Sequence, residues 1–506
     1  MIDEILLDEF VDQEVGKLYT KLRSLHQFEF PTDYQLKVVY TKDVVNNPDY
    51  PGEYLNHLVR ILSEIDIPTF FVCVETNCKN IARDLDHLNS IYNNGIVKHK
   101  ILNGIFDAIE VKKDTFCILP WMHFYFNPQG QVTPCCDANT NYPLSNYKTN
   151  KIDFNSAKIV KFRETLLNGL EAPQCSSCYI KEQNQVVSLR QTFNQKFYSY
   201  RPKEPTANVD DFKLRYVDVR LSNVCNLKCR MCSGKFSSRI ADEDYKIWGA
   251  TEFIRTSNST QEEDKILDIL LDQIDNIEHL YFAGGEPLIS ETHYKILDLM
   301  LLHNKRNINI SYNTNFSILN YKKHNVLDYW KKFKNVKLGA SIDLIGPAAD
   351  YVRNGVDYQT LEDNYQALKA NCPDVKFTIT SVLSLYNIFN LCKLQRHWID
   401  NIGLSPTDLT FVNLVNPDHL SSRVLPKHVK QDAERTITSH IRYLESINAI
   451  SLAKQWGAAL TYMNSQDHSY LLTKFFELGD IRDQHRKQSF ESYFPEFSDL
   501  RASLVL

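Results

Sequence analysis

Three cysteines in one short stretch carry the clearest chemical signal of this sequence. Cys225, Cys229 and Cys232 stand at C-x3-C-x2-C spacing. Three close thiolates can hold three irons of a [4Fe–4S] cluster, which leaves the fourth iron open to a molecule other than protein. A structural zinc site needs four ligands, usually from C-x2-C pairs, and no fourth Cys or His lies close by in the sequence. The spacing therefore favours an iron–sulfur cluster with one open position.

A second group of cysteines lies earlier in the chain. An alternating aromatic run, a turn at 127–130 and a Cys-Cys pair follow Cys117, and a C-x2-C pair comes later. This order predicts a two-stranded hairpin with cysteines at its open ends. The spacing does not separate zinc from an iron–sulfur cluster, because both accept four thiolates. The cysteines that suffice for one fully ligated site are Cys117, Cys135, Cys175 and Cys178, with Cys136 as a spare or alternative.

Strands and helices alternate through residues 213–416, and this alternation must position the chemistry. Six strand–helix units in succession predict parallel strands with helices outside. Functional residues of such folds lie at the carboxyl ends of the strands. The cysteine triad follows the first of these strands. The predicted strands are 214–221, 278–283, 308–314, 336–342, 376–382 and 409–415.

Further polar motifs follow the later strands. Gly284-Gly285-Glu286-Pro287 follows the second strand. Its glycines let the backbone approach a ligand closely, and its carboxylate can accept hydrogen bonds from an ammonium group. A tight turn would also explain these residues. Asn313-Thr314-Asn315 could bind a ligand or cap a helix. Arg353 could grip a carboxylate with two parallel hydrogen bonds or form an ordinary salt bridge. The other candidate contacts at strand ends are Ser341, Asp343, Asn387, Asn413 and Asn416.

The triad, followed one strand later by GGEP, resembles the signature of the radical S-adenosylmethionine (SAM) enzymes. The resemblance implies a partial (β/α)6 TIM-like barrel, a [4Fe–4S] cluster on the triad, and SAM chelated to the open iron. It also implies reductive cleavage of SAM to a 5′-deoxyadenosyl radical that abstracts hydrogen, with an electron donor such as flavodoxin or ferredoxin. Met231 stands where many members carry an aromatic residue, and its thioether can fill the same space. The residues expected to bind SAM are Gly284, Gly285, Glu286, Pro287, Asn315, Ser341 and Arg353.

The earlier cysteine group is similar to the auxiliary-cluster domains of the same family. The matching pattern is Cys117-x12-Gly130-x4-Cys135 followed by C-x2-C. The SPASM form of this domain holds two clusters and the twitch form one, and too few cysteines remain here for two. The resemblance therefore implies a single auxiliary [4Fe–4S] cluster, in a domain that precedes the barrel instead of following it. Relatives with such domains often modify peptides, so a peptide or protein substrate is expected; no residue stands out as catalytic.

Length and composition bound the rest of the interpretation. The chain has 506 residues, 43% hydrophobic, with a formal net charge of −5. This is a multidomain globular composition that gives no reason to expect nucleic acid or a membrane surface as partner, and no apolar run reaches the ~18 residues of a bilayer span. An N-terminus unlike a signal peptide and clustered cysteines predict a cytoplasmic protein. The expected parts are a small α/β domain at 1–113, the auxiliary domain at 114–205, the barrel at 206–425 and outer helices at 426–506. The first domain is expected to open on an acidic amphipathic stretch and to hold strands at 36–40 and 69–74 and helices at 53–65 and 80–93. The outer helices are expected at 427–447, 449–464 and about 467–489.

Two other classes of protein compete with this interpretation. A non-catalytic iron–sulfur protein that transfers electrons or senses redox state would explain the cysteines, but neither GGEP nor the open coordination position. A zinc-stabilised binding module would favour a basic surface, and 57 basic against 62 acidic residues give it no support. The sequence leaves open the atom attacked, the fate of SAM, the oligomeric state and the role of residues 1–113.

Overall fold

The chain divides into two compact units, residues 1–112 and 113–506, and each is described by itself. The computed structural model describes the backbone of three strands in the first unit. In the second unit it describes side chains over residues 115–183, 187–202, 204–249, 264–497 and 500–501, with the backbone of 260–263 in addition.

The described strands of the first unit form a parallel sheet in the order β1-β2-β3. They are β1 (Ile2–Leu6), β2 (Gln35–Tyr40) and β3 (Thr69–Cys73). Two of them were expected, at 36–40 and 69–74, and both are rich in β-branched and aromatic residues. The acidic amphipathic stretch at the start of the chain supplies the third. The helices predicted at 53–65 and 80–93 lie outside the described residues.

The second unit is built on one nine-stranded sheet, in the order β16-β15-β13-β10-β9-β7-β4-β5-β6. Neighbouring strands run parallel from β16 to β4, and the last two pairs are antiparallel. All six strands predicted at 214–415 form. The strands of this sheet are β4 (His123–Phe126), β5 (Gln131–Thr133), β6 (Ser145–Asn146), β7 (Tyr216–Val219), β9 (His279–Phe282), β10 (Asn309–Thr314), β13 (Asn335–Ala340), β15 (Lys376–Leu383) and β16 (Leu409–Asn413).

The cysteine-bearing hairpin is part of this sheet. The predicted hairpin forms from β4 and β5, and β4 pairs in parallel with β7, with Tyr125 opposite Asp218. The sequence pattern indicated a hairpin standing in its own segment; here it extends the parallel sheet by three strands. The result is a mixed α/β unit with a largely parallel sheet.

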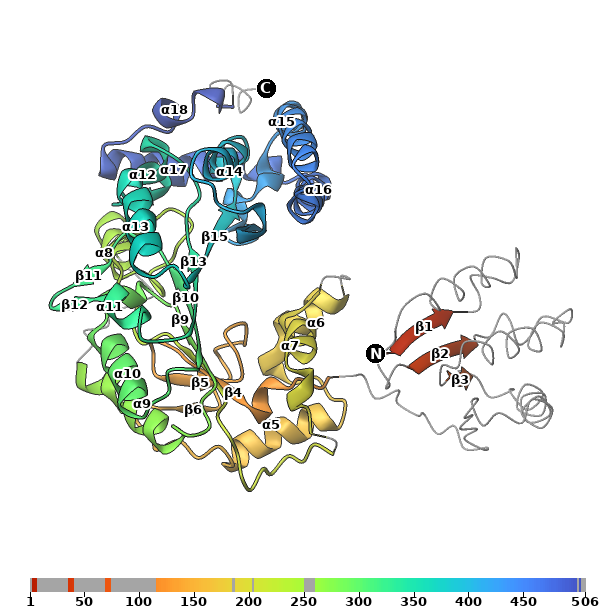
Figure 1. The fold of residues 1–506 in the computed structure, drawn as a ribbon. Coiled ribbons are helices and arrows are strands. Elements are labelled where there is room, and N and C mark those ends of the chain that lie inside the picture. The colour runs from red at the N-terminus through yellow and green to blue at the C-terminus, as the bar shows by residue number, and fades with distance from the viewer. Residues whose placement is uncertain are drawn as a thin grey trace, which may run out of the picture. The chain divides into compact units, whose positions relative to one another are not determined.

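Helices cover one face of the sheet, and the other face is exposed along β10 and β13. Figure 1 shows α10 (Glu291–Leu302), α11 (Val326–Trp330) and α13 (Tyr358–Asn371) beside strands β9, β10 and β13. Ile310 and Leu338 on the covered face are fully buried, whereas Asn309 and Lys337 on the other face are exposed. Successive side chains of a strand point to opposite faces, so the alternation separates an apolar core from a polar, accessible surface.

The remaining elements flank this sheet. The predicted helices at 427–447 and 449–464 form as α15 and α16, and the third begins at Leu472 instead of 467 because a short 3-10 turn precedes it. Across the described residues, no helix is long and apolar enough to cross a membrane. The other helices are α5 (Ala157–Leu167), α6 (Ser176–Gln183), α7 (Leu189–Lys196), α8 (Ser238–Trp248), α9 (Thr260–Asp272), α12 (Pro347–Val352), α14 (Leu391–Asp400), α15 (Lys427–Ser446), α16 (Ile450–Asn464), α17 (Leu472–Arg486) and α18 (Phe490–Tyr493).

Candidate active site

The cysteine triad lies on the loop that leaves β7, hereafter the cluster loop (residues 225–232). Its middle part forms a two-residue strand, β8 (Lys228–Cys229), which pairs antiparallel with β14 (Arg353–Asn354). This pairing sets Arg353 opposite Cys229, and the guanidinium Nη1 lies 3.7 Å from the Cys229 Sγ. Residues far apart in sequence thus meet at the carboxyl end of the sheet.

One of the three cysteines, Cys229, is buried, and the other two are half-buried. Burial raises the pKa of Cys225 and Cys229, and it raises that of Cys232 to about 12. A neighbouring thiolate adds to the rise at Cys225 and Cys232, while Arg353 opposes it at Cys229. Thiolates here need positive charge close by, which iron supplies, so the donor set suits an iron–sulfur cluster.

The described residues contain no group of three His, Cys, Asp or Glu side chains placed to hold a metal ion. In a [4Fe–4S] cluster each thiolate binds a different iron. The cysteines of such a site therefore surround the cluster instead of converging on one ion.

The GGEP loop packs directly on the backbone before Cys225. The Gly285 N–H donates to the Ser222 carbonyl (3.1 Å) and the Glu286 N–H to the Val224 carbonyl (2.8 Å). A Cβ added to Gly285 would lie 2.2 Å from the Val224 carbonyl oxygen. The Gly285 backbone therefore approaches the backbone of Val224 closely, and this contact couples the GGEP loop to the cluster loop.

Glu286 joins the ends of two strands. Its carboxylate accepts hydrogen bonds from the Thr314 hydroxyl (2.6 Å), the Asn315 N–H (2.7 Å) and the Leu288 N–H (3.1 Å). The residue is 3% exposed, and burial raises its pKa to about 7 despite these donors. The carboxylate is thus held by the protein at the strand ends, next to the cluster loop.

Asn315 links β10 to the cluster loop. Its Nδ2 donates to the Asn226 Oδ1 (2.8 Å) and lies 4.0 Å from the Cys225 Sγ. Its Oδ1 accepts from the Ser317 N–H (3.0 Å), as a local turn would predict. The helix cap that was the alternative for this residue does not form, because the next helix, α11, is capped by Asn325; the ligand contact stays a prediction.

Arg353 forms the salt bridge that the sequence left as an alternative. Its Nε donates to Asp343 (2.7 Å), whose side chain is 1% exposed and also accepts from the Val382 N–H (2.8 Å). Ser341 lines the same small cavity as Arg353 and Asp343. Asn387, by contrast, is buried with its amide donating to the carbonyls of Val382 (2.9 Å) and Asp343 (3.3 Å), so protein contacts engage it.

The second cysteine group also comes together. Cys117, Cys135, Cys175 and Cys178 line one small cavity, and burial raises the pKa of each thiol. Cys136 is exposed and instead lies beside Arg220, which forms an ion pair with Asp218 (3.1 Å). The hairpin therefore separates two adjacent cysteines into different environments.

Sequence reasoning missed one residue of this second site. Arg190 lines the cavity, donates to the Phe116 carbonyl (2.8 Å), and pairs with Glu182 (2.6 Å). Its charge opposes the effect of burial on the pKa of Cys117 and Cys175. No spacing rule would have singled it out, because it lies on α7 and reaches the cysteines only through the fold.

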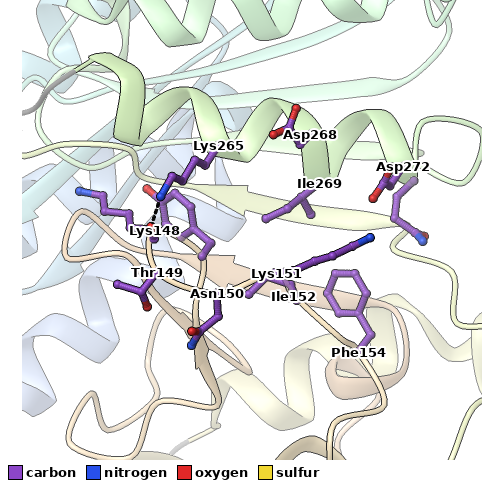
Figure 2. A pocket seen from close by; sticks show the side chains of 12 residues that line it. Lys148, Thr149, Asn150, Lys151, Ile152, Phe154, Lys265, Asp268, Ile269 and Asp272 are labelled. Atoms are coloured by element: carbon purple, nitrogen blue, oxygen red, sulfur yellow. Dashed lines mark hydrogen bonds between the residues drawn. The ribbon is translucent and has the colours of Figure 1, made fainter.

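A separate cavity lies away from both cysteine groups. It has a volume of about 510 Å³ and sits between the segment 147–154 and helix α9. Figure 2 shows Lys265 of α9 reaching across it toward Lys148, whose carbonyl accepts a hydrogen bond from the Lys265 amine. None of the residues predicted for either site lines it.

Comparisons with known proteins agree with both cysteine motifs. Residues 219–385 match the model of the Radical SAM superfamily, and residues 117–179 match that of SPASM, an iron-sulfur cluster-binding domain. The SPASM match lies before the radical SAM match, as the cysteine order predicted. A comparison with curated proteins gives no match.

Solved structures give distant similarities. "Native anSMEcpe with bound AdoMet" is 19% identical, with a TM-score of 0.33 over 46% of this chain and 62% of that one. "Crystal structure of Streptococcus suis SuiB bound to precursor peptide SuiA" is 13% identical, with a TM-score of 0.26 over 56% and 60%. The chain thus spans about three fifths of the length of these structures.

Proposed function

We propose that this chain, whose residues 219–385 match the Radical SAM superfamily and whose residues 117–179 match SPASM, is a radical SAM enzyme that modifies a peptide or protein by hydrogen abstraction. The two domains imply [4Fe–4S] clusters and SAM as cofactors. With SAM bound, the [4Fe–4S] cluster of the radical SAM domain would supply a 5′-deoxyadenosyl radical by reductive cleavage of SAM. The electron would come from a donor such as flavodoxin or ferredoxin.

One observation carries this proposal: the ends of three strands converge on the cluster loop, which itself follows β7. Glu286 follows β9, Asn315 follows β10, and Asp343 follows β13 and holds Arg353 against Cys229. Hydrogen bonds connect Glu286 to Asn315 and Asn315 to Asn226 of the cluster loop. A structural cysteine knuckle would have no need of this polar surround.

Each part of the site has a distinct task in the proposal. Cys225, Cys229 and Cys232 hold three irons of the cluster. The 284–287 loop and Asn315 orient the amino and ribose groups of SAM, and Ser341 contacts the ribose. Arg353 has five N–H donors, so it can meet the SAM carboxylate while it pairs with Asp343.

The uncovered face of the sheet suits an extended substrate. The exposed polar residues on this face lie along β10 and β13, before the carboxyl ends of the strands; they are Asn309, Asn313 and Lys337. A peptide lying on this face would meet polar side chains and end near the cluster loop.

We propose that the segment 117–178 holds a single auxiliary [4Fe–4S] cluster on Cys117, Cys135, Cys175 and Cys178, as in a twitch domain, with structural zinc as the alternative.

The experiment measures iron, sulfide and 5′-deoxyadenosine after anaerobic reconstitution. The wild type is compared with the variant Cys225→Ala/Cys229→Ala/Cys232→Ala. A matched control, Cys372→Ala/Cys392→Ala, removes buried cysteines that line neither site. We expect about eight irons per chain in the wild type and the control, falling to about four in the triple variant, with loss of 5′-deoxyadenosine only in that variant.

Two outcomes would correct the proposal. About four irons falling to none, with roughly one zinc retained, would make the 117–178 site structural zinc. Formation of 5′-deoxyadenosine by the triple variant would exclude the cluster loop as the site of SAM cleavage.

A further inference from the structure

A buried ion pair connects the cluster loop to the C-terminal helix α17. Arg230, which lies between Cys229 and Cys232, pairs through Nη2 with Asp483 and donates to the Gln488 Oε1 (3.0 Å). The side chains of Arg230 and Asp483 are 1% and 8% exposed. The two residues are separated by 253 positions in the sequence.

The same pair is tied to the segment that carries Arg353. The Arg230 Nε donates to the Tyr351 carbonyl (2.8 Å), and its backbone N–H donates to the Val352 carbonyl (2.8 Å). Asp483 in turn accepts from the Tyr351 hydroxyl (3.0 Å) and the Phe490 N–H (2.9 Å). The guanidinium lies 3.6 Å over the Tyr351 ring. Arg230 thus ties the cluster loop both to α17 and to the segment 351–352.

A second set of ion pairs also joins the cluster loop to α17. It centres on Glu243 of α8, whose side chain is 2% exposed. The Glu243 carboxylate accepts from Lys228 of the cluster loop (3.2 Å) and from Arg482 (2.7 Å) and Arg486 (2.6 Å) of α17. The Arg486 side chain is 1% exposed. Its charge also reaches Cys229, where it opposes the effect of burial on the thiol pKa.

Buried ion pairs of this kind are weak evidence for a role in stability. Their desolvation often offsets their attraction, and apolar substitutes can be as stable, so their use is better explained where they fix a position. One guanidinium nitrogen of Arg230 and one of Arg486 are buried without a hydrogen-bond partner in the described part of the chain.

We infer that α17 positions the cluster: Asp483 fixes the main chain between Cys229 and Cys232 through Arg230, and Arg486 holds a positive charge close to the cluster loop through Glu243, which also pairs with Lys228. Asp483 and Arg486 are positioning residues, since they act through other groups. The inference rests on the proposed assignment of Cys225, Cys229 and Cys232 as cluster ligands. A cation near an anionic cluster favours the reduced state, so Arg486 should raise the reduction potential.

The first test uses Asp483→Asn in the full-length reconstituted protein. The matched control is Asp480→Asn on the same helix, because Asp480 is half exposed and pairs with Arg501 at the surface. We expect the SAM affinity, read from the change that SAM causes in the electron paramagnetic resonance spectrum of the reduced cluster, to fall about tenfold in Asp483→Asn. The control should match the wild type.

A paired variant separates positioning from loss of folding. Asp483→Asn leaves the Arg230 charge buried alone, whereas Arg230→Gln/Asp483→Asn removes both charges. If Asp483 acts through Arg230, the double variant loses no more SAM affinity than Arg230→Gln alone. Additive losses would overturn this route.

The charge of Arg486 is tested by the midpoint potential of the reconstituted cluster. Arg486→Gln should shift it to a more negative value, while Arg501→Gln should leave it unchanged. Midpoint potentials and SAM affinities equal to those of the controls, for both α17 variants, would overturn the inference. Loss of radical-site iron in the triple cysteine variant would still uphold the proposed function in that case, so the two failures can be told apart.

Discussion

At the scale of the residue, neighbours in sequence have different tasks. Cys135 lines the cavity with three other cysteines, whereas Cys136 is exposed beside the Asp218–Arg220 ion pair. The two cysteines lie in the bend and turn that follow β5, where the Ala138 N–H donates to the Cys135 carbonyl (3.3 Å). The Thr133 hydroxyl donates to the same carbonyl (2.9 Å), so this turn places the first thiol in the cavity and the second outside it.

This difference predicts the outcome of two single substitutions. Cys135→Ala should lower the iron retained at the 117–178 site, because it removes one of four thiolate ligands. Cys136→Ala should retain all of it. Iron per chain, measured in the background of the triple cysteine variant so that only this site contributes, checks both. Equal iron in the two variants would show that the cysteines substitute for each other.

At the scale of the element, the GGEP loop and the cluster loop are packed together, so one cannot move without the other. The GGEP loop after β9 lies backbone to backbone on the residues that enter the cluster loop after β7. β7 and β9 are adjacent parallel strands, so their following loops must share the same edge of the sheet. Gly285 permits the contact, and the hydrogen bonds of Glu286 extend it to β10.

Gly285→Ala should therefore disturb the cluster without touching a cysteine. The new methyl group would lie 2.2 Å from a backbone oxygen, so one loop must move. We expect folding stability to fall by about 1–3 kcal/mol and SAM affinity to fall about tenfold. Calorimetry and SAM titration measure the two effects.

The control for this substitution is Gly457→Ala in α16. A methyl group there meets nothing within 4 Å, and alanine is the better helix former by about 1 kcal/mol. This variant should keep the SAM affinity of the wild type and be no less stable. An unchanged SAM affinity in Gly285→Ala would contradict the coupling of the two loops.

At the scale of the whole second unit, the C-terminal helices close the fold around buried polar groups. His440 of α15 is 1% exposed, and its Nε2 bonds to the Gln395 Oε1 of α14 (2.8 Å), which also accepts from Trp456 of α16 (2.8 Å). Burial lowers the pKa of His440 to about 4. His123 and His293 are likewise buried with a lowered pKa.

These histidines make the unit sensitive to acid. Between the folded pKa of His440, about 4, and the ordinary value of 6.5, the unfolded chain binds a proton that the folded chain does not. Stability therefore rises with pH across this window and is lost as the pH falls through it. At pH 5 the loss attributable to His440 is about 2 kcal/mol relative to pH 7.

Thermal unfolding at pH 7 and pH 5 tests this expectation. His440→Gln should be less stable than the wild type at pH 7 but lose less stability on acidification. His303→Gln, which alters an exposed histidine, should keep the pH dependence of the wild type. The same acid-induced loss in both variants would mean that His440 does not titrate in this window.

The sequence by itself determined the chemistry and most of the elements. Cysteine spacing, the GGEP motif and the six strands are local patterns, and side-chain type and periodicity are enough to predict them. The family matches at 117–179 and 219–385 agree with the cofactors inferred from those patterns. Local patterns were less reliable at boundaries, as the strand at Ile2–Leu6 and the start of α17 show.

Only the tertiary structure decided which distant residues meet. It joined the hairpin to the parallel strands through β4 and β7, placed Cys135 in the cavity with three other cysteines, and set Arg353 against Cys229. It also brought Asp483 to Arg230. Such contacts depend on how the whole chain packs, because a buried charge finds its partner by proximity in space. No spacing along the sequence encodes that proximity.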